Sequence, residues 1–189
     1  MPNFVKLYAL LPKLSTPKRE MRRVLKRSSE KTVVFVILPG TPDWAIILPR
    51  VKLYITSKQR AEIVAHVQSG LPQETCGLLW GRDGRALVHR PADNVARSPT
   101  RYEMDPIWQV AVMHEMLARG LELVAIYHSH PEGPSVPSTA DVARAYYPDS
   151  AYIILSPGPD REWKMKAFRI VEGQVSAIEI LVAGAGDAI

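Results

Sequence analysis

The residues best suited to chemistry in this sequence are two histidines and an aspartate, His128, His130 and Asp141. Both histidines follow the aliphatic run 121–127, which is typical of a buried strand, and side chains two apart on a strand share a face. The proline-rich segment 131–137 predicts a turn that brings Asp141 back beside them. Two imidazoles, one carboxylate and a position left for water form the ligand set of a catalytic zinc site. The spacing therefore predicts one Zn2+ ion held by these three side chains.

The pair Ser138 and Asp141 also has a purely structural interpretation. Ser-x-x-Asp before residues 142–146 is a capping pattern, in which the serine caps a helix and the aspartate lies in its first turn. This pattern explains both residues without a metal ion, and an isolated His-x-His pair is a weak signal. The metal-site hypothesis becomes specific only together with a carboxylate earlier in the chain.

That carboxylate is Glu74, at the entry to an otherwise apolar predicted strand over 73–81. Hydrolysis needs a base for the attacking water, and a carboxylate within hydrogen-bond reach can pass the proton on to a leaving amine. Glu74 is the candidate if its strand lies beside the one that ends at His128. Ser138 is a candidate donor to the developing oxyanion, although one hydroxyl can hardly do this and cap a helix at once. Cys76 is interpreted as a small buried residue rather than a ligand or nucleophile.

A helix is predicted directly after the first strand of the domain. Thr56 offers an N-cap, with Gln59 three residues later, and Ser69-Gly70 ends the helix. His66 is expected on the flank of the buried face, as a surface or boundary residue. The buried face itself is predicted to carry Ile63, Val64 and Val67.

A second helix is predicted from Asp105-Pro106, with aspartate at the N-cap and proline in the first turn, to Gly120. His114 falls on its expected buried stripe and is interpreted as a packed or edge histidine. The other members of that stripe are Ile107, Val110, Ala111 and Leu117.

Short apolar runs between these helices predict strands. Asp83-Gly84 between two such runs is a strong hairpin signal, and Gly173 supplies another turn. The alternation of strands and helices predicts an α/β fold. The strands are expected over 51–55, 73–81, 85–89, 121–127, 151–156, 164–171 and 174–182.

The formal charge of +5 is unevenly distributed. Residues 1–50 hold ten basic and three acidic side chains, a balance of +7, whereas residues 51–189 have a balance of −2. The basic charge therefore lies outside the part that carries the histidines, which argues against nucleic acid as a partner. No run approaches the roughly 18 apolar residues of a membrane span. The single cysteine suits a reducing compartment, which we expect to be the cytoplasm.

Residues 1–50 are interpreted as an appended basic leader, and residues 51–189 as one domain. The leader has several open explanations: a disordered arm, an organelle transit peptide, a segment that binds an acidic partner or membrane surface, or translation that really starts near Val51. A secretory signal is not expected, because no apolar segment is combined with a small-residue cleavage site.

The combination of Glu74, His128-Ser129-His130-Pro131 and Ser138-x-x-Asp141 resembles the signature of the JAMM (MPN-plus) zinc metalloproteases. The segments 72–81, Asn94 with Ser98-Pro99, and 146–148 with 167–170 resemble the compact bacterial branch of that family, and the resemblance covers about 51–182. It implies a curved mixed β-sheet flanked by helices, similar to cytidine deaminases. It also implies that His128, His130 and Asp141 bind zinc, that Glu74 is the general acid/base, and that Ser138 assists the oxyanion.

Members of this family cleave amide or isopeptide bonds at the C-terminal tail of ubiquitin-like proteins. The compact bacterial branch includes enzymes that free cysteine from a sulfur-carrier protein during cysteine biosynthesis. The resemblance therefore implies a metallopeptidase acting on a ubiquitin-like or sulfur-carrier protein with a Gly-Gly tail, and the short segment 131–137 favours release of cysteine. The alternatives are an isopeptidase that removes such a modifier from lysine, and a non-catalytic module that binds it. The oligomeric state is left open.

Overall fold

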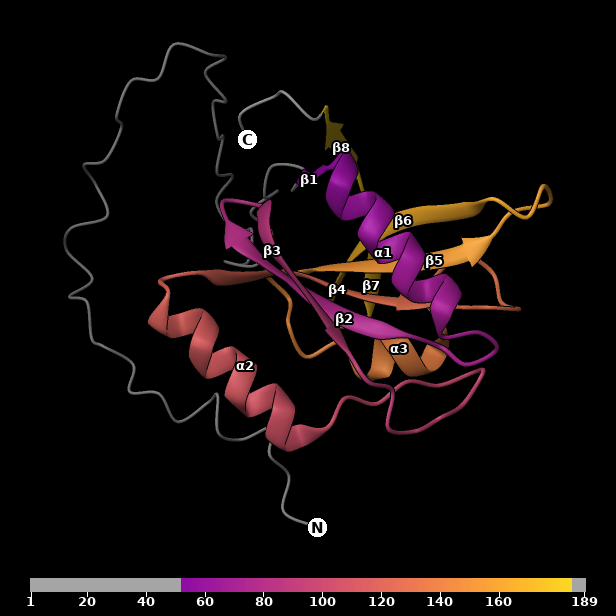
Figure 1. Ribbon diagram of the computed structural model, residues 1–189, viewed down its shortest axis with the longest axis horizontal. Helices are drawn as coiled ribbons and strands as arrows, with labels where there is room; N and C mark the ends of the chain where they lie inside the picture. Colours follow the sequence, from indigo (N-terminus) through magenta and orange to yellow (C-terminus); the bar gives the residue numbers. More distant parts are fainter. Residues whose placement is uncertain (1–51, 185–189) are drawn as a thin grey trace, which may run out of the picture. The chain divides into compact units, whose positions relative to one another are not determined.

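The computed structural model describes residues 52–184, which form one mixed eight-stranded sheet with helices on both faces (Figure 1). The predicted leader 1–50 lies outside the described residues. The order across the sheet is β7-β6-β5-β4-β2-β3-β1-β8, with parallel pairs at β1/β3, β1/β8 and β4/β5. The expected α/β class is confirmed. The strands are β1 (Leu53–Thr56), β2 (Cys76–Arg82), β3 (Arg85–Ala92), β4 (Glu122–Ser129), β5 (Ala151–Pro157), β6 (Trp163–Val171), β7 (Gln174–Ile178) and β8 (Ile180–Ala183).

The last two strands correct the prediction of one continuous strand over 174–182. β7 pairs with β6, but after Glu179 the chain continues as β8 and pairs with β1 at the other edge of the sheet. The break falls at Glu179 because its carbonyl accepts a hydrogen bond from the backbone of Leu53, at the start of β1, at 3.0 Å. A single segment thus links both edges, which requires the sheet to curve strongly.

The two faces of the sheet bury separate apolar clusters. Helix α1 (Ser57–Ser69) contributes Ile63 and Val67 to the cluster on one face, which includes Tyr127 of β4. Helix α2 (Pro106–Ala118) packs on the cluster of the other face, and residues of the short helix α3 (Thr139–Ala143) and its C-terminal flank join it. No helix among residues 52–184 is long and apolar enough to cross a membrane.

Helix α1 begins and ends as predicted. The hydroxyl of Thr56 accepts a hydrogen bond from the backbone of Gln59 at 3.0 Å, and the Gln59 side chain accepts one from the backbone of Thr56 at 2.9 Å. This reciprocal capping box satisfies two amide donors that the first turn leaves free. Gly70 forms the C-cap.

Helix α2 has the predicted ends but a different buried face. Its sheet-facing residues are Val112, Met113 and Met116, whereas Ile107 is 82% exposed and His114 is also exposed. The predicted stripe was wrong because α2 carries apolar residues on two faces, so that periodicity alone does not choose between them. The observed rotation buries Val112, Met113 and Met116 in the apolar cluster of this face, and it also lets Glu115 form an ion pair with Arg90 of β3 at 3.0 Å. The other members of the predicted stripe, Val110, Ala111 and Leu117, are exposed as well.

Both predicted tight turns are present. Asp83 and Gly84 have φ values of 51° and 74°, and Glu172 and Gly173 have values of 50° and 79°. Two consecutive residues with positive φ are the backbone of a type I′ hairpin, which follows the natural twist of the strands. These turns join β2 to β3 and β6 to β7.

Candidate functional site

Strand β4 carries the two histidines to the middle of the sheet. His128 lies inside β4, opposite Cys76 of β2 on one side and Ile154 of β5 on the other. The backbone of His130, just past the strand end, still donates to the carbonyl of Leu155 at 2.8 Å. Because both neighbouring strands fix the backbone here, the two imidazoles are held on one face, and both are buried.

Asp141 reaches the histidines from α3, as the turn over 131–137 predicted. The capping box of α3 is complete: the Ser138 hydroxyl accepts from the backbone of Asp141 at 3.2 Å, and the Asp141 carboxylate accepts from the backbone of Ser138 at 2.7 Å. The Ser138 hydroxyl also donates to that carboxylate at 2.6 Å. The capping interpretation is therefore correct, and it is compatible with a metal site, because the cap itself aims Asp141 at the histidines.

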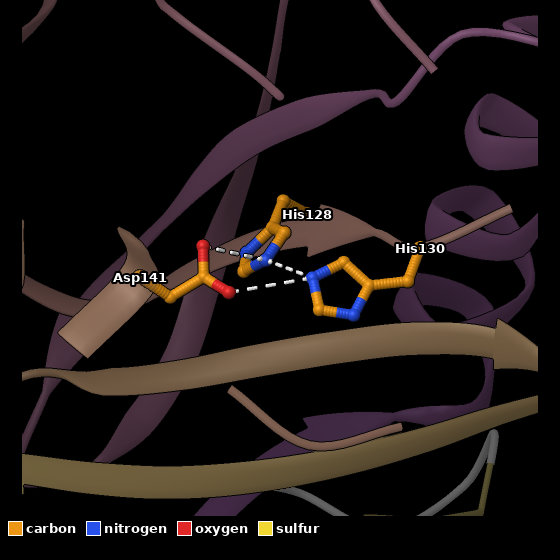
Figure 2. Close-up of side chains that lie close together, drawn as sticks. All are labelled: His128, His130 and Asp141. Carbon is orange, nitrogen blue, oxygen red and sulfur yellow. Dashed lines mark hydrogen bonds and ion pairs between the residues drawn. The ribbon is translucent and has the colours of Figure 1, made fainter. Parts of the chain in front are cut away.

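The three side chains converge with the spacing of metal ligands (Figure 2). Nε2 of His128 and Nε2 of His130 lie 2.9 Å apart, and each lies 3.3 or 3.4 Å from an oxygen of Asp141. Ligand atoms bound tetrahedrally to zinc at 2.0–2.1 Å lie about 3.3–3.4 Å from one another. The two distances to Asp141 match this spacing and the distance between the imidazoles is shorter, so the three side chains are compatible with a bound metal ion.

The far side of each imidazole is held differently. Nδ1 of His130 is hydrogen bonded to the carbonyl of Pro134 at 2.8 Å, which leaves Nε2 free to act as a ligand. Within residues 52–184, Nδ1 of His128 is buried and has no hydrogen-bond partner. Its ring instead stacks on Tyr102, with centroids 4.5 Å apart and planes at 26°. On its Nδ1 side, His128 is therefore oriented by packing rather than by a hydrogen bond.

The charges of the triad are strongly coupled. Burial alone would raise the pKa of Asp141, but hydrogen bonds from His128 and His130 outweigh it and hold that pKa well below its usual range. Burial lowers the pKa of His128. Burial also opposes a charge on His130, but its bonds to Asp141 and Pro134 raise its pKa. The site therefore offers an ionised carboxylate, which a bound cation would stabilise further.

Glu74 lies two residues before β2, and β2 pairs with β4. This is the strand arrangement under which the sequence made Glu74 the candidate base near His128. Its backbone is tied on both sides, because its amide donates to Ser98 at 2.9 Å and its carbonyl accepts from Asn94 at 2.9 Å. Burial raises the pKa of Glu74 to about 7, with nearby His130 opposing the shift and Asp141 adding to it. A carboxyl group with this pKa can both accept and donate a proton near neutral pH.

Two further residues near the site had no role assigned from the sequence. Tyr102 carried no signal, yet it stacks on His128, and Asn94, noted only as part of the family resemblance, donates a hydrogen bond to the carbonyl of Glu74. On the opposite face, the buried hydroxyl of Tyr127 is hydrogen bonded to both His66 and His89 at 2.8 Å. Cys76 is buried and unpaired, as predicted.

Comparison with known proteins gives a consistent picture. The family described as prokaryotic homologs of the JAB domain matches residues 56–170. The chain is 37% identical to CysO-cysteine peptidase of Mycobacterium tuberculosis, over 60% of this chain and 80% of that protein. It is 36% identical to a desampylase of Haloferax volcanii, over 62% of this chain and 92% of that protein.

Two further similarities extend this picture. The chain is 38% identical to the probable TtuB-protein conjugate cleaving protease of Thermus thermophilus, over 68% of this chain and 83% of that protein. Among solved structures, a protein from Desulfitobacterium hafniense superposes with a TM-score of 0.63 at 34% identity, over 70% of this chain and 93% of that one. The similarity in sequence and in structure therefore falls on the part that carries the site.

Proposed function

This chain belongs to the family of prokaryotic homologs of the JAB domain, and from that membership we propose that it is a zinc-dependent metallopeptidase. Its substrate would be an amide bond at the C-terminal tail of a ubiquitin-like or sulfur-carrier protein, and its product cysteine. The observation that carries the proposal is the convergence of His128, His130 and Asp141 at zinc-ligand spacing, next to a carboxyl group with a pKa of about 7.

In this proposal His128 and His130 supply two neutral imidazole nitrogens, and Asp141 supplies one carboxylate oxygen. Zinc held there would act as a Lewis acid and lower the pKa of water to about 7. Ser138 keeps Asp141 in place through the capping box, which makes the ligand set rigid. The same hydroxyl, once it turns away from Asp141, is the proposed donor to the oxyanion.

Glu74 is the proposed general acid and base. It takes a proton from the attacking water while the water oxygen bonds to the scissile carbonyl carbon, and it gives that proton to the leaving nitrogen as the C–N bond breaks. The products are the carrier with a free C-terminal carboxylate and the released amine. The backbone of Glu74 is hydrogen bonded to Ser98 and Asn94. This supports the role, because a fixed backbone keeps the carboxyl group within reach of both the attacking water and the leaving nitrogen.

The names of the relatives support the substrate class. They describe a peptidase for CysO-cysteine, desampylases and a protease for TtuB-protein conjugates. We propose an extended tail ending in Gly-Gly, since small residues let a chain pass close to the site. Cysteine is the first choice of leaving group, removal of a modifier from lysine is the second, and binding without cleavage is the third. We propose that the reaction takes place in the cytoplasm, with Cys76 reduced.

The metal and the base are tested separately. Protein purified without added metal should contain one zinc ion per chain by elemental analysis. Glu74→Gln should keep that zinc and lose about 10²–10⁴-fold in rate, the usual worth of general acid–base catalysis, whereas His130→Ala should lose the metal as well. The metal assignment fails if His128→Ala and wild type contain equal metal, and the assignment of roles fails if Glu74→Gln releases zinc.

The leaving group is tested with two adducts of a sulfur carrier, one bearing C-terminal cysteine and one joined to a lysine side chain. Mass spectrometry reports which adduct loses mass. Cleavage of the cysteine adduct is expected. Cleavage of only the lysine conjugate would favour the isopeptidase. If the protein binds zinc but cleaves neither adduct, the non-catalytic binding module is favoured.

A further inference from the structure

A polar groove of about 680 Å³ is lined in part by Glu74. This volume is within the range of ligand pockets, roughly 300–1,000 Å³. Glu74 is the one proposed site residue in its lining, which does not include His128, His130 or Asp141. Glu74 thus belongs to the groove lining and is also close enough to His130 and Asp141 for both to influence its pKa.

A hydrogen bond ties one wall of the groove to the backbone of Glu74. The loop after β3 supplies Asp93 and Arg97 to the lining, and Asn94 of this loop donates to the Glu74 carbonyl. The Asn94 side chain also accepts hydrogen bonds from the backbone of Ala96 at 3.1 Å and of Glu103 at 3.0 Å. These bonds join the two ends of the loop. The position of Asp93 and Arg97 relative to Glu74 is therefore built into the backbone.

Asp93 and Arg97 bring opposite charges to the groove without neutralising each other. In the described part of the chain, neither side chain forms an ion pair or hydrogen bond. Arg97 also has a φ of 46°, a backbone conformation that costs a non-glycine residue free energy and that clusters at functional sites. Arg97 is exposed, and its unpaired guanidinium at the groove wall is available to bind a carboxylate.

His66 also lines the groove, and a hydrogen bond fixes the orientation of its ring. Nδ1 of His66 is hydrogen bonded to the Tyr127 hydroxyl, which also binds Nε2 of His89 at 2.8 Å. Burial lowers the pKa of His66, so a neutral imidazole lines the groove. The groove therefore combines a cation, an anion and a neutral polar ring.

We propose that this groove is the leaving-group site and that Arg97 binds the free α-carboxylate of the amino acid that is released. The inference rests on the proposed function, because Glu74 can protonate the leaving nitrogen only if that nitrogen lies within hydrogen-bond reach. In a C-terminal amino acid the carboxylate is one carbon from that nitrogen and lies on the Glu74 side. Asp93 then faces the ammonium group of the product. A lysine in an isopeptide bond has no free carboxylate near its ε-nitrogen, so the groove selects C-terminal amino acids.

The test compares a carrier that ends in Gly-Gly-Cys as the free acid with the same carrier as the C-terminal amide. The full-length wild-type chain should show a KM about 10–100-fold lower for the acid, the effect of one hydrogen-bonded charge pair, with a much smaller change in kcat. Arg97→Ala should raise the KM for the acid to that for the amide and leave the amide unchanged. Arg101→Ala is the matched control, because it removes an arginine of the same loop that does not line the groove.

Equal KM values for acid and amide in the wild type, or a preference that survives in Arg97→Ala, would overturn the proposal while hydrolysis itself stands. A preference for the lysine conjugate that is insensitive to Arg97 would overturn it too. A measurement without turnover uses S-methyl-L-cysteine as the probe. Its addition to the full chain should shift the backbone amide resonances of Asp93 and Arg97, and Arg97→Ala should abolish the shifts. No shift in the wild type contradicts the site, whatever the activity.

Discussion

The hydroxyl of Tyr127 provides a measurable link between α1, β3 and β4. Tyr127 is completely buried in β4, and its hydroxyl lies 2.8 Å from Nδ1 of His66 and from Nε2 of His89. Tyr127→Phe removes this oxygen and keeps the ring, which fills the space above Gly77. The substitution therefore probes two hydrogen bonds with little change in apolar packing.

The expected loss follows from the surroundings of each histidine. Two hydrogen bonds contribute about 1 kcal/mol each, and a buried nitrogen left without a partner costs roughly 1–3 kcal/mol. His66 borders the open groove and can bind water, whereas the side chain of His89 is only 10% exposed and keeps Glu62 as a distant partner at 3.7 Å. We expect Tyr127→Phe to lower the free energy of unfolding by about 2–4 kcal/mol.

Urea unfolding followed by circular dichroism measures this loss as a lower midpoint with an unchanged slope. Tyr146→Phe is the control, because Tyr146 is 56% exposed and the change should cost less than about 0.5 kcal/mol. A loss below about 0.5 kcal/mol for Tyr127→Phe as well would refute the reasoning, since it would mean that water replaces both bonds at no cost.

Three further predictions concern other parts of the chain. Burial raises the pKa of the Cys76 thiol to about 12, so iodoacetamide at pH 8 should leave native protein unmodified and label it only in denaturant; rapid native labelling would contradict this. Burial lowers the pKa of His66 and His89 from 6.5, which makes the fold less stable as the pH falls through that value, whereas the raised pKa of Glu74 acts in the opposite direction; the change in Tm from pH 7.5 to 5.5 should therefore be less favourable in wild type than in His89→Asn, and an equal change would contradict this. A chain that starts at Val51 should fold and hydrolyse like the full chain, because the family match spans 56–170; loss of activity would assign residues 1–50 a role.

Features set by neighbouring residues were predictable from the sequence. The caps at Thr56 and Ser138 and the turns at Asp83-Gly84 and Glu172-Gly173 depend on local hydrogen bonds and on φ preferences. The triad was predictable for a related reason. The strand period fixes the relation of His128 to His130, and the turn and cap fix that of Asp141 to both.

Features set by distant contacts were not predictable. The rotation of α2 depends on the apolar cluster that distant strands supply, and the apolar pattern of the helix allowed two answers. The break at Glu179 depends on a contact with β1. It was not predictable, because no local signal marks where a strand changes its partner. The role of Tyr127 was hidden for the same reason: a tyrosine in a buried strand is expected in any core, and its partners come from α1 and β3.

The link between the two sheet edges determines when the fold can be completed during synthesis. β1 has one registered pair with β3, Tyr54 with Arg85, but four with β8, which leaves the ribosome after every other described strand. Strands β2 to β6 can pair as they emerge, while β1 waits for a partner from the far end of the domain, a contact with a high cost in loop closure. A nascent or prematurely terminated chain that lacks β7 and β8 would therefore present β6 and β1 as open edges, the state most exposed to aggregation and proteolysis.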